Sequence, residues 1–354
     1  MNRRALSRRQ FVKLGFGALG GAALAAADPR AAAGRVPFLG TITQTHHFPA
    51  IREKAVAAAR VTLVKGDSRY AIVSQSLKLI ENDILNSIGG KKILLKPNVV
   101  LADNPLAVTH VDALRAILDF LKPHYKDRIL VGEGGFHPTF DGFKAHGYLE
   151  LEKSYNIKLV DLNAGPFVHR YVFGKEHNPI PVRINSLCLD PNVYIISAAP
   201  MKTHNYALVT LSLKNLLIGA PIKDEKSNDK ALFHTGDTAV NDILHYNMFN
   251  LAQEAWPDLA VIDGFEAMEG NGPAWGTPFP ARVALAGRDA LAVDTLTTKI
   301  MGFDPKRVLY LTAMNEFGMG QGNLEKIGVE GTPLDQCRFK LKPHEKMAEL
   351  YKLT

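Results

Sequence analysis

The sequence predicts an α/β protein with a mostly parallel sheet and helices on both faces. Three observations support this expectation. Short apolar runs recur along the chain, segments of helical periodicity lie between several of them, and polar residues with Gly or Pro follow most of the runs. Strands that alternate with amphipathic helices favour parallel pairing, because each helix packs back onto the sheet as a crossover.

Seven apolar runs are expected to form the strands: 61–64, 93–95, 129–131, 157–160, 193–196, 259–262 and 283–285. Each run is short and is bounded by turn-forming or charged residues, which is typical of buried parallel strands. The fourth run is the least regular, because Lys158 interrupts it.

Six segments have the apolar spacing of amphipathic helices: 70–87, 111–121, 143–155, 208–217, 240–255 and 290–301. A short helix over 51–60 is a further expectation. The stretches 173–181 and 270–280 contain Gly and Pro and are expected to be long surface loops. Because no internal repeat or linker separates these elements, a single α/β domain is expected over residues 34–354.

The pattern of residues 1–33 predicts a twin-arginine export signal. Ser7-Arg8-Arg9 precedes a weakly apolar segment, Leu14 to Ala27, and the Ala runs 25–27 and 31–33 offer cleavage sites. The apolar segment is shorter than the ~20 residues that span a bilayer, so no stable membrane span is expected after cleavage. We therefore expect the twin-arginine translocation machinery as a partner and the periplasm as the location. A basic amphipathic helix or an uncleaved anchor is the alternative.

The charge is concentrated in this leader. The whole chain carries a formal charge of +7, but six basic residues and one acid precede Gly34, which leaves 36 basic and 34 acidic residues. A body of charge +2 lacks the broad basic surface of a phosphate-backbone binder, so nucleic acid is not an expected partner.

The chain contains only two cysteines, Cys188 and Cys337. A cysteine-ligated iron–sulfur cluster needs about four, and a Cys-rich zinc module is excluded on the same count. Whether the two cysteines form one disulfide is left open by the sequence.

Polar residues follow several of the expected strands. Lys96 follows the second run, and Glu133 lies shortly beyond the third. Lys202 and His204 come after the fifth run, and Asp263 directly follows the sixth. Because ligands of open α/β sheets bind outside the carboxyl ends of the strands, these side chains are expected to share one crevice. Each also has an ordinary structural explanation, as a strand cap, a glycine turn or a hydrogen-bonded loop.

Two lysines stand out. Lys202 and His204 lie two positions apart and can point the same way from an extended segment, which would combine an anion anchor with an acid/base group or metal ligand. Lys214 lies in an apolar helical segment, where its charge must either reach water or meet a carboxylate, and Asp294 is a candidate partner. Asp289 is expected to cap the helix that follows it.

Three carboxylates, Asp263, Glu266 and Glu269, are spaced three residues apart, and the glycines beside them favour a loop over a helix. His204, Asp263 and Glu269 are candidate ligands of a divalent metal ion, with His234 as a further candidate. The same acids could act as an acid/base pair. The alternative is an acidic, solvated loop.

Several of these residues also form a recognisable family pattern, which consists of Leu95-Lys96-Pro97-Asn98, Gly132-Glu133-Gly134, Lys202-Thr203-His204, Leu213-Lys214-Asn215-Leu216-Leu217-Ile218-Gly219, Asp263-Gly264 with Met268-Glu269-Gly270-Asn271-Gly272-Pro273, and Asp289 to Asp294. Over about residues 61–320 the chain thus resembles the "domain of unknown function 362" family. That family has little settled chemistry. Many of its members carry a ferredoxin-like cluster segment, but two cysteines cannot supply that cluster, so the resemblance does not imply electron transfer here.

The leading hypothesis is a periplasmic enzyme that acts on a small anionic or carbonyl-bearing molecule. Lys96, Lys202 and Lys214 would hold negative charge, while Glu133 and His204 would move protons. Fixed cations stabilise an oxyanion or enolate-like intermediate. The expected reaction class is therefore proton transfer next to a carbonyl, as in an isomerase or epimerase, with or without help from a metal.

The competing hypothesis is a periplasmic solute-binding or cofactor-carrier protein, in which the same side chains only recognise a ligand. The sequence names no cofactor. A divalent metal is one candidate, and a group attached covalently to Lys202 is another. The motifs of common nucleotide-binding proteins, serine hydrolases and zincins are absent from the sequence.

Overall fold

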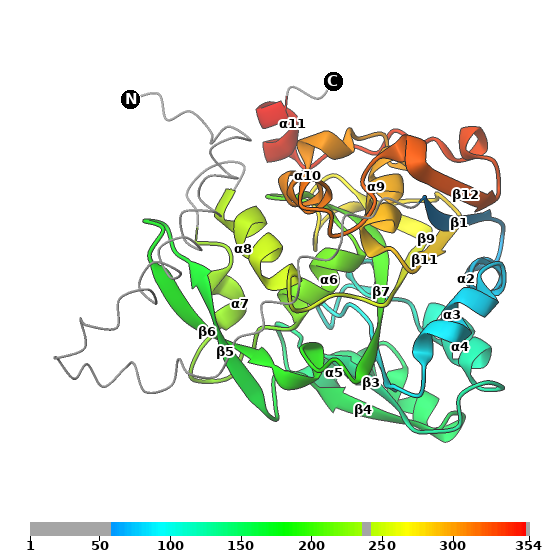
Figure 1. The fold of residues 1–354 in the computed structure, drawn as a ribbon, viewed down its shortest axis with the longest axis horizontal. Coiled ribbons are helices and arrows are strands. Elements are labelled where there is room, and N and C mark those ends of the chain that lie inside the picture. Colours follow the sequence, from blue (N-terminus) through cyan, green and yellow to red (C-terminus); the bar gives the residue numbers. More distant parts are fainter. Residues whose placement is uncertain (1–57, 236–241, 352–354) are drawn as a thin grey trace, which may run out of the picture.

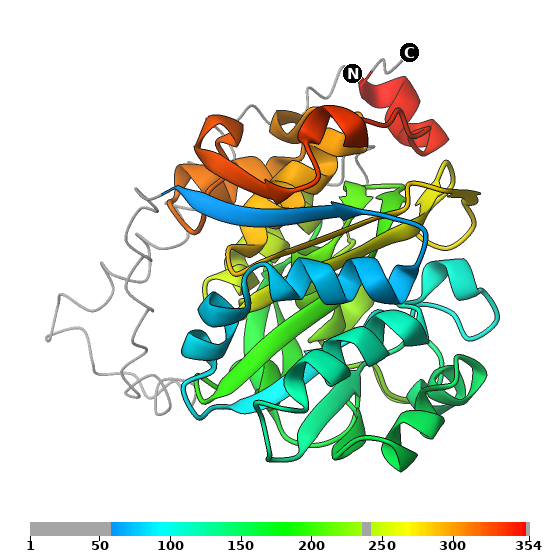
Figure 2. The same ribbon diagram turned by 90° about the vertical axis from the view of Figure 1, so that its right-hand side faces the viewer.

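The computed structural model describes residues 58–235 and 242–351. The expected export signal and most of the expected helix over 51–60 lie outside these residues. In the part that is described, a twisted sheet runs through the centre of the molecule with helices on both faces (Figures 1 and 2). The predicted fold class is confirmed.

The main sheet contains ten strands, of which eight form its path in the order β12-β1-β11-β9-β7-β2-β3-β4. Along this path only β11 runs antiparallel to its neighbours. All seven apolar runs that predict strands lie within strands of this path. The eight are β1 (Ala59–Lys65), β2 (Lys92–Lys96), β3 (Ile129–Glu133), β4 (Ile157–Asp161), β7 (Val193–His204), β9 (Leu259–Glu269), β11 (Val283–Gly287) and β12 (Ile327–Gly331).

Alternation of side chains along the strands supplies two hydrophobic cores, one on each face. In β2, Ile93 and Leu95 point into one core and Leu94 into the other. One core is covered by α2 (Arg69–Lys78), α3 (Glu81–Ile88), α4 (Val111–Leu121) and α5 (Thr139–Ala145). The other is covered by α6 (Ser212–Gly219), α8 (Asp242–Ala252), α9 (Ala290–Ile300), α10 (Leu309–Glu316) and α11 (Glu345–Tyr351).

The helices predicted over 111–121 and 290–301 match α4 and α9, and Asp289 caps α9 by accepting a hydrogen bond from the Ala292 N–H. The helix predicted over 70–87 is two helices, because the backbone at Ile80 leaves the helical conformation. The one predicted over 143–155 begins earlier, as α5, and stops before Gly147, which has a φ of 75°.

The predicted helix 208–217 begins as a strand instead. β8 (Leu208–Thr210) turns back onto the end of β7 in an antiparallel pair, and α6 starts only at Ser212. This short hairpin sets the position of α6 next to the carboxyl end of β7.

Two expected loops contain strands. The stretch 173–181 is the turn region of a hairpin between β5 (Phe167–Phe173) and β6 (Pro179–Asn185). The stretch 270–280 includes β10 (Thr277–Phe279), which pairs with the last part of β9. The carboxylates of 263–269 therefore lie on a strand and not in the expected loop, because backbone pairing on both sides extends β9 through Glu269. Among the helices of residues 58–235 and 242–351, none is both long and apolar enough to cross a membrane.

Candidate functional site

The carboxyl ends of β2, β3 and β7 meet at a cavity of about 370 Å³. The three strands are neighbours in the sheet, and α6 and α7 (Asp229–Leu232) close the cavity from the side. Its polar lining includes Asn98, Glu133, His204, Tyr206, Thr210, Lys214, Asn215, Lys230 and His234. A cavity is therefore present where the sequence predicts the site, at the carboxyl ends of the strands.

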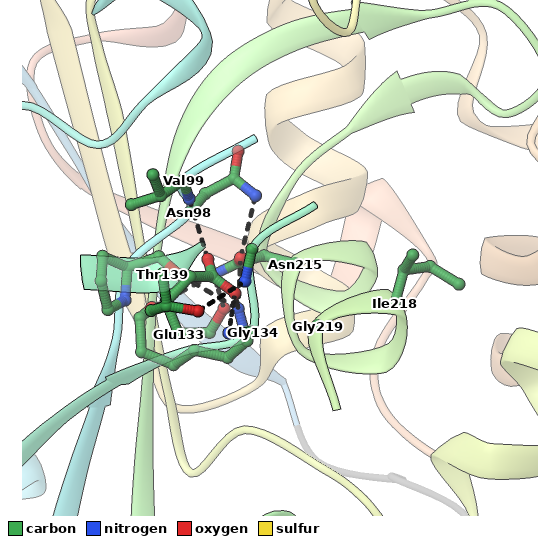
Figure 3. Close-up of polar contacts among 12 residues, drawn as sticks. Asn98, Val99, Glu133, Gly134, Thr139, Asn215, Ile218 and Gly219 are labelled. Atoms are coloured by element: carbon green, nitrogen blue, oxygen red, sulfur yellow. Dashed lines mark hydrogen bonds and ion pairs between the residues drawn. The ribbon is translucent and has the colours of Figure 1, made fainter. Parts of the chain in front are cut away.

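A buried ion pair forms the floor of the site. Lys96 Nζ donates to Glu133 Oε1 at 2.9 Å, to Asn215 Oδ1 at 2.9 Å and to the carbonyl oxygen of the next residue. Glu133 also accepts hydrogen bonds from the backbone N–H groups of Gly134 and Val99. Figure 3 shows the side chains of Glu133 and Asn215 converging within this network. Lys96 is fully buried, its three protons are used, and it is not among the residues that line the cavity.

Lys202 belongs to the same network on its other side. Its Nζ donates to Asn98 Oδ1 at 2.7 Å and to the Ala107 carbonyl oxygen at 2.9 Å, and it is fully buried. Asn98 Nδ2 in turn donates to Asn215 Oδ1. Burial, together with the nearby charge of Lys214, lowers the pKa of Lys202 to about 7. Lys202 therefore positions Asn98, and it is Asn98 that lines the cavity.

Gly219 is the last residue of α6 and lies directly against Lys96. A Cβ atom at this position would collide with Cε and Nζ of Lys96 and would reach Glu133 Oε1 at 3.4 Å. The helix can approach the ion pair only because position 219 has no side chain.

We expect Gly219→Ala to lower the free energy of unfolding by about 2 to 3 kcal/mol, the upper range for overpacking, since the buried pair cannot shift freely. Denaturant titration measures the loss. Gly328→Ala is the matched control, because a Cβ there meets only the Ala59 carbonyl oxygen, at 3.7 Å. Equal stability of the two variants would contradict the close contact.

The amino end of α6 is held by Asp294. Its carboxylate accepts hydrogen bonds from the Ser212 N–H at 3.0 Å, the Leu213 N–H at 2.9 Å and the Ser212 hydroxyl. Burial raises the pKa of Asp294 to about 7 in spite of these bonds. The expected pair between Asp294 and Lys214 is not formed, because this carboxylate caps the helix instead.

Lys214 is the unusual side chain of the cavity. It lines the cavity, is only 7% exposed, and has no hydrogen-bond or ion-pair partner among the residues that the structure describes. Loss of solvation lowers its pKa to about 7. Among the described residues the lysine meets no carboxylate, and it is almost fully buried, so near neutral pH a large fraction of it is an uncharged amine at the cavity.

Two histidines line the cavity with their rings 6.4 Å apart. His204 Nδ1 accepts hydrogen bonds from the N–H groups of Tyr206 and Ala207, so the proton of the neutral ring is on Nε2. His234 Nδ1 donates to the Lys230 carbonyl oxygen, which places its proton on Nδ1. Burial lowers the pKa of His234 to about 4 and that of His204 well below its usual range. Both rings are therefore neutral at pH 7.

Lys230 and Thr210 also line the cavity, and no motif in the sequence points to either. Lys230 Nζ donates to the carbonyl oxygens of Gly219 and Pro221 at the end of α6, and burial lowers its pKa to about 7. In the sequence it lies in a charged stretch that resembles a solvated loop. Thr210 is buried on β8, and its hydroxyl has no hydrogen-bond partner in the described part of the chain.

The carboxylates expected to bind a metal lie elsewhere. Asp263 is paired with Arg69, with 3.0 Å between Arg69 Nε and Asp263 Oδ2, and Glu269 accepts a hydrogen bond from the Lys342 N–H. Neither lines the cavity with His204. Within 58–235 and 242–351, no three His, Cys, Asp or Glu side chains are placed to hold a metal ion together. The expected set of His204, Asp263 and Glu269 is therefore not assembled, because β9 directs its acids to partners of their own.

The fold and the site define an open α/β protein with a buried polar cavity at the carboxyl ends of its parallel strands. The chain belongs to the family described as Domain of unknown function (DUF362), whose sequence profile matches residues 93–299. This confirms the resemblance drawn from the motifs. A thylakoid-associated protein of Synechocystis is 25% identical over 232 residues, which are 65% of this chain and 69% of that protein.

Two solved structures have a distant likeness to the chain. A Thermotoga maritima protein is 14% identical with a TM-score of 0.39, and the alignment covers 61% of this chain and 56% of the other. The lactate racemase apoprotein of Thermoanaerobacterium thermosaccharolyticum is 17% identical with a TM-score of 0.40, with coverage of 66% and 54%. The chain thus spans little more than half the length of either protein. Likenesses at this level carry no functional argument.

Proposed function

We propose that the protein is an enzyme that moves a proton on a small carbonyl-bearing molecule bound in the cavity at the ends of β2, β3 and β7. One observation carries the proposal: Lys214 presents a buried amine without a partner among the described residues, and its pKa is about 7. A group that is half protonated near neutral pH can both accept and return a proton. Membership of the family supplies no chemistry of its own.

In this proposal the neutral amine of Lys214 takes a proton from the carbon next to the carbonyl group. Negative charge then develops on the oxygen of the bound molecule. The Nε2–H of His204 and the hydroxyl of Thr210 are the donors that would stabilise it, and both side chains line the same cavity. Return of the proton from the Lys214 ammonium to another face or to a neighbouring carbon completes an epimerisation or isomerisation. A divalent metal is not part of the proposal, because its expected ligands are not brought together.

The test is exchange of carbon-bound hydrogen in D₂O, followed by proton NMR on a panel of small ketones, aldehydes and 2-oxo carboxylates. We expect saturable, protein-dependent loss of the signal from the carbon next to the carbonyl group of at least one compound. Saturable stabilisation against heat without any exchange would favour the alternative, a solute-binding or carrier protein that recognises the same molecules.

We also propose that the protein acts in the periplasm after twin-arginine export. The support is the leader, in which Arg8 and Arg9 precede the apolar segment 14–27 and the alanines that follow. Replacing both arginines by lysine should retain the precursor in the cytoplasm of a bacterial host, as measured by cell fractionation and immunoblotting. A matched Arg3→Lys/Arg4→Lys variant should be exported. Equal periplasmic yield of both variants would contradict this route.

A further inference from the structure

Three donors at the cavity have no acceptor in the described part of the protein. They are the Thr210 hydroxyl, whose oxygen is a fully buried atom without a partner, and the Lys214 amine and the Nε2–H of His204, whose residues line the cavity. Each of the three residues is more than nine-tenths buried. A buried donor without an acceptor lowers the stability of the folded protein, so natural proteins rarely keep one without a reason. Three that line one cavity indicate a ligand that brings its own acceptor oxygens.

Among the described residues, the carboxylate that lines this cavity is that of Glu133, and it already has hydrogen-bond and ion-pair partners. Glu133 accepts from Lys96 and from two backbone N–H groups, so its charge is matched inside the protein. The charges that act on His204 from nearby include those of Lys214 and Lys202, and both are positive when protonated. The cavity therefore favours a ligand group with negative charge, because no lining residue that the structure describes has a carboxylate left to balance these cations.

The position of Lys214 suggests what lies next to that negative group. Thr210 and Lys214 are separated only by the first turn of α6, and His204 pairs with Leu208 on the neighbouring strand. An anion held by Thr210 and His204 thus sits beside the Lys214 amine in a cavity of about 370 Å³. If the anion is a carboxylate, the carbon atom attached to the carboxylate group therefore lies next to the Lys214 amine.

We infer that the cavity binds a 2-oxo carboxylate, with its carboxylate on Thr210 and His204, and that Lys214 condenses with its keto carbon to form an imine. This inference rests on the proposed function in one respect, since both place Lys214 at the reacting carbon. The lone pair of Nζ forms the new N–C bond, and the C–O bond of the keto group breaks. The oxygen leaves as water with the two protons of the amine, so no oxidant or reductant is consumed.

The imine also explains how a weak base could remove a proton from the carbon next to the imine carbon. A protonated imine withdraws electrons from the adjacent carbon more strongly than the parent ketone does. Within the imine Lys214 is no longer free to act as the base, so a neighbouring group would then take the proton. His234 lines the same cavity and remains neutral at pH 7.

The experiment is reductive trapping of the full chain with pyruvate or glyoxylate and cyanoborohydride at pH 7, followed by intact mass spectrometry and peptide mapping. We expect one adduct per chain at Lys214. Lys214→Met should abolish it, whereas Lys153→Met, which removes an exposed lysine, should leave it unchanged. Acetate has the carboxylate but no keto group and should protect Lys214 in the unaltered protein.

Thr210→Val tests the carboxylate anchor, because valine keeps the shape of threonine and removes the hydroxyl. It should weaken trapping of pyruvate by about tenfold or more, as expected for a hydrogen bond to a charged group, and weaken trapping of neutral acetaldehyde much less. Adducts spread over exposed lysines at a rate that Lys214→Met does not alter would overturn the inference. So would a failure of acetate to protect Lys214.

The imine and the proposed proton transfer are contradicted by different results. Hydrogen exchange without trapping would overturn the imine and leave Lys214 as a simple base. Trapping without hydrogen exchange would support the imine and overturn proton transfer as the function.

Discussion

Replacing Lys214 by methionine is expected to lower the hydrogen-exchange rate of a bound carbonyl compound by at least about a hundredfold, the usual contribution of a positioned acid/base group. In the unaltered protein the rate should rise with pH and level off above about pH 7, because only the neutral amine accepts a proton and the pKa of Lys214 is about 7. Initial rates by proton NMR between pH 5.5 and 9 measure both effects.

The Lys214→Met variant should remain folded, because methionine fills a similar volume and carries no charge into the buried site. Between about pH 7 and 10.5 the unfolded chain binds a proton at Lys214 that the folded protein does not. The stability of the unaltered protein relative to the variant should therefore rise with pH across this window, by about 1 kcal/mol per unit. An unchanged exchange rate in the folded variant would remove Lys214 from the reaction.

Glu133→Gln is expected to lower the free energy of unfolding by about 3–5 kcal/mol, because it leaves the fully buried Lys96 ammonium without a carboxylate. Glutamine also cannot replace both carboxylate oxygens as acceptors for Lys96 and the Val99 N–H. Equilibrium unfolding in urea measures the loss.

The double variant Lys96→Met/Glu133→Gln is the decisive control. It removes the unmatched charge together with its partner, so it should be more stable than Glu133→Gln alone. Glu81→Gln, in the exposed pair of Lys78 and Glu81, should change the stability little. If the double variant were no more stable than the single one, the loss would not come from an uncompensated charge.

Seven strands of the main sheet were predictable because each carries an apolar run, most of which is buried. β8, β10 and β12 have no such signal. β12 has the sequence Ile-Gly-Val-Glu-Gly and lies at the edge of the sheet, where only its pairing with β1 makes it a strand. β8 is three residues long and forms because β7 turns back on itself. A strand that forms only through pairing with a distant segment, or that is only three residues long, leaves no periodic pattern in the sequence to detect.

The site was predictable in place but not in detail. The strand-end rule located Lys96, Glu133 and His204 at one crevice, but it could not tell which of them would be used internally. Lys202 and His204 lie two residues apart on β7, yet one holds Asn98 and the other lines the cavity. That difference depends on which acceptors the neighbouring strand and loop supply, and those acceptors are set by tertiary structure.

The pairing of β1 also bears on the order in which the protein can fold as it is synthesised. β1 lies between β11 and β12, so both of its neighbours come from the last quarter of the chain. At roughly 5–20 residues per second, a ribosome needs on the order of ten seconds or more to reach β12 after it has made β1. This edge of the sheet is therefore completed only after β12 has been made, long after β1 itself.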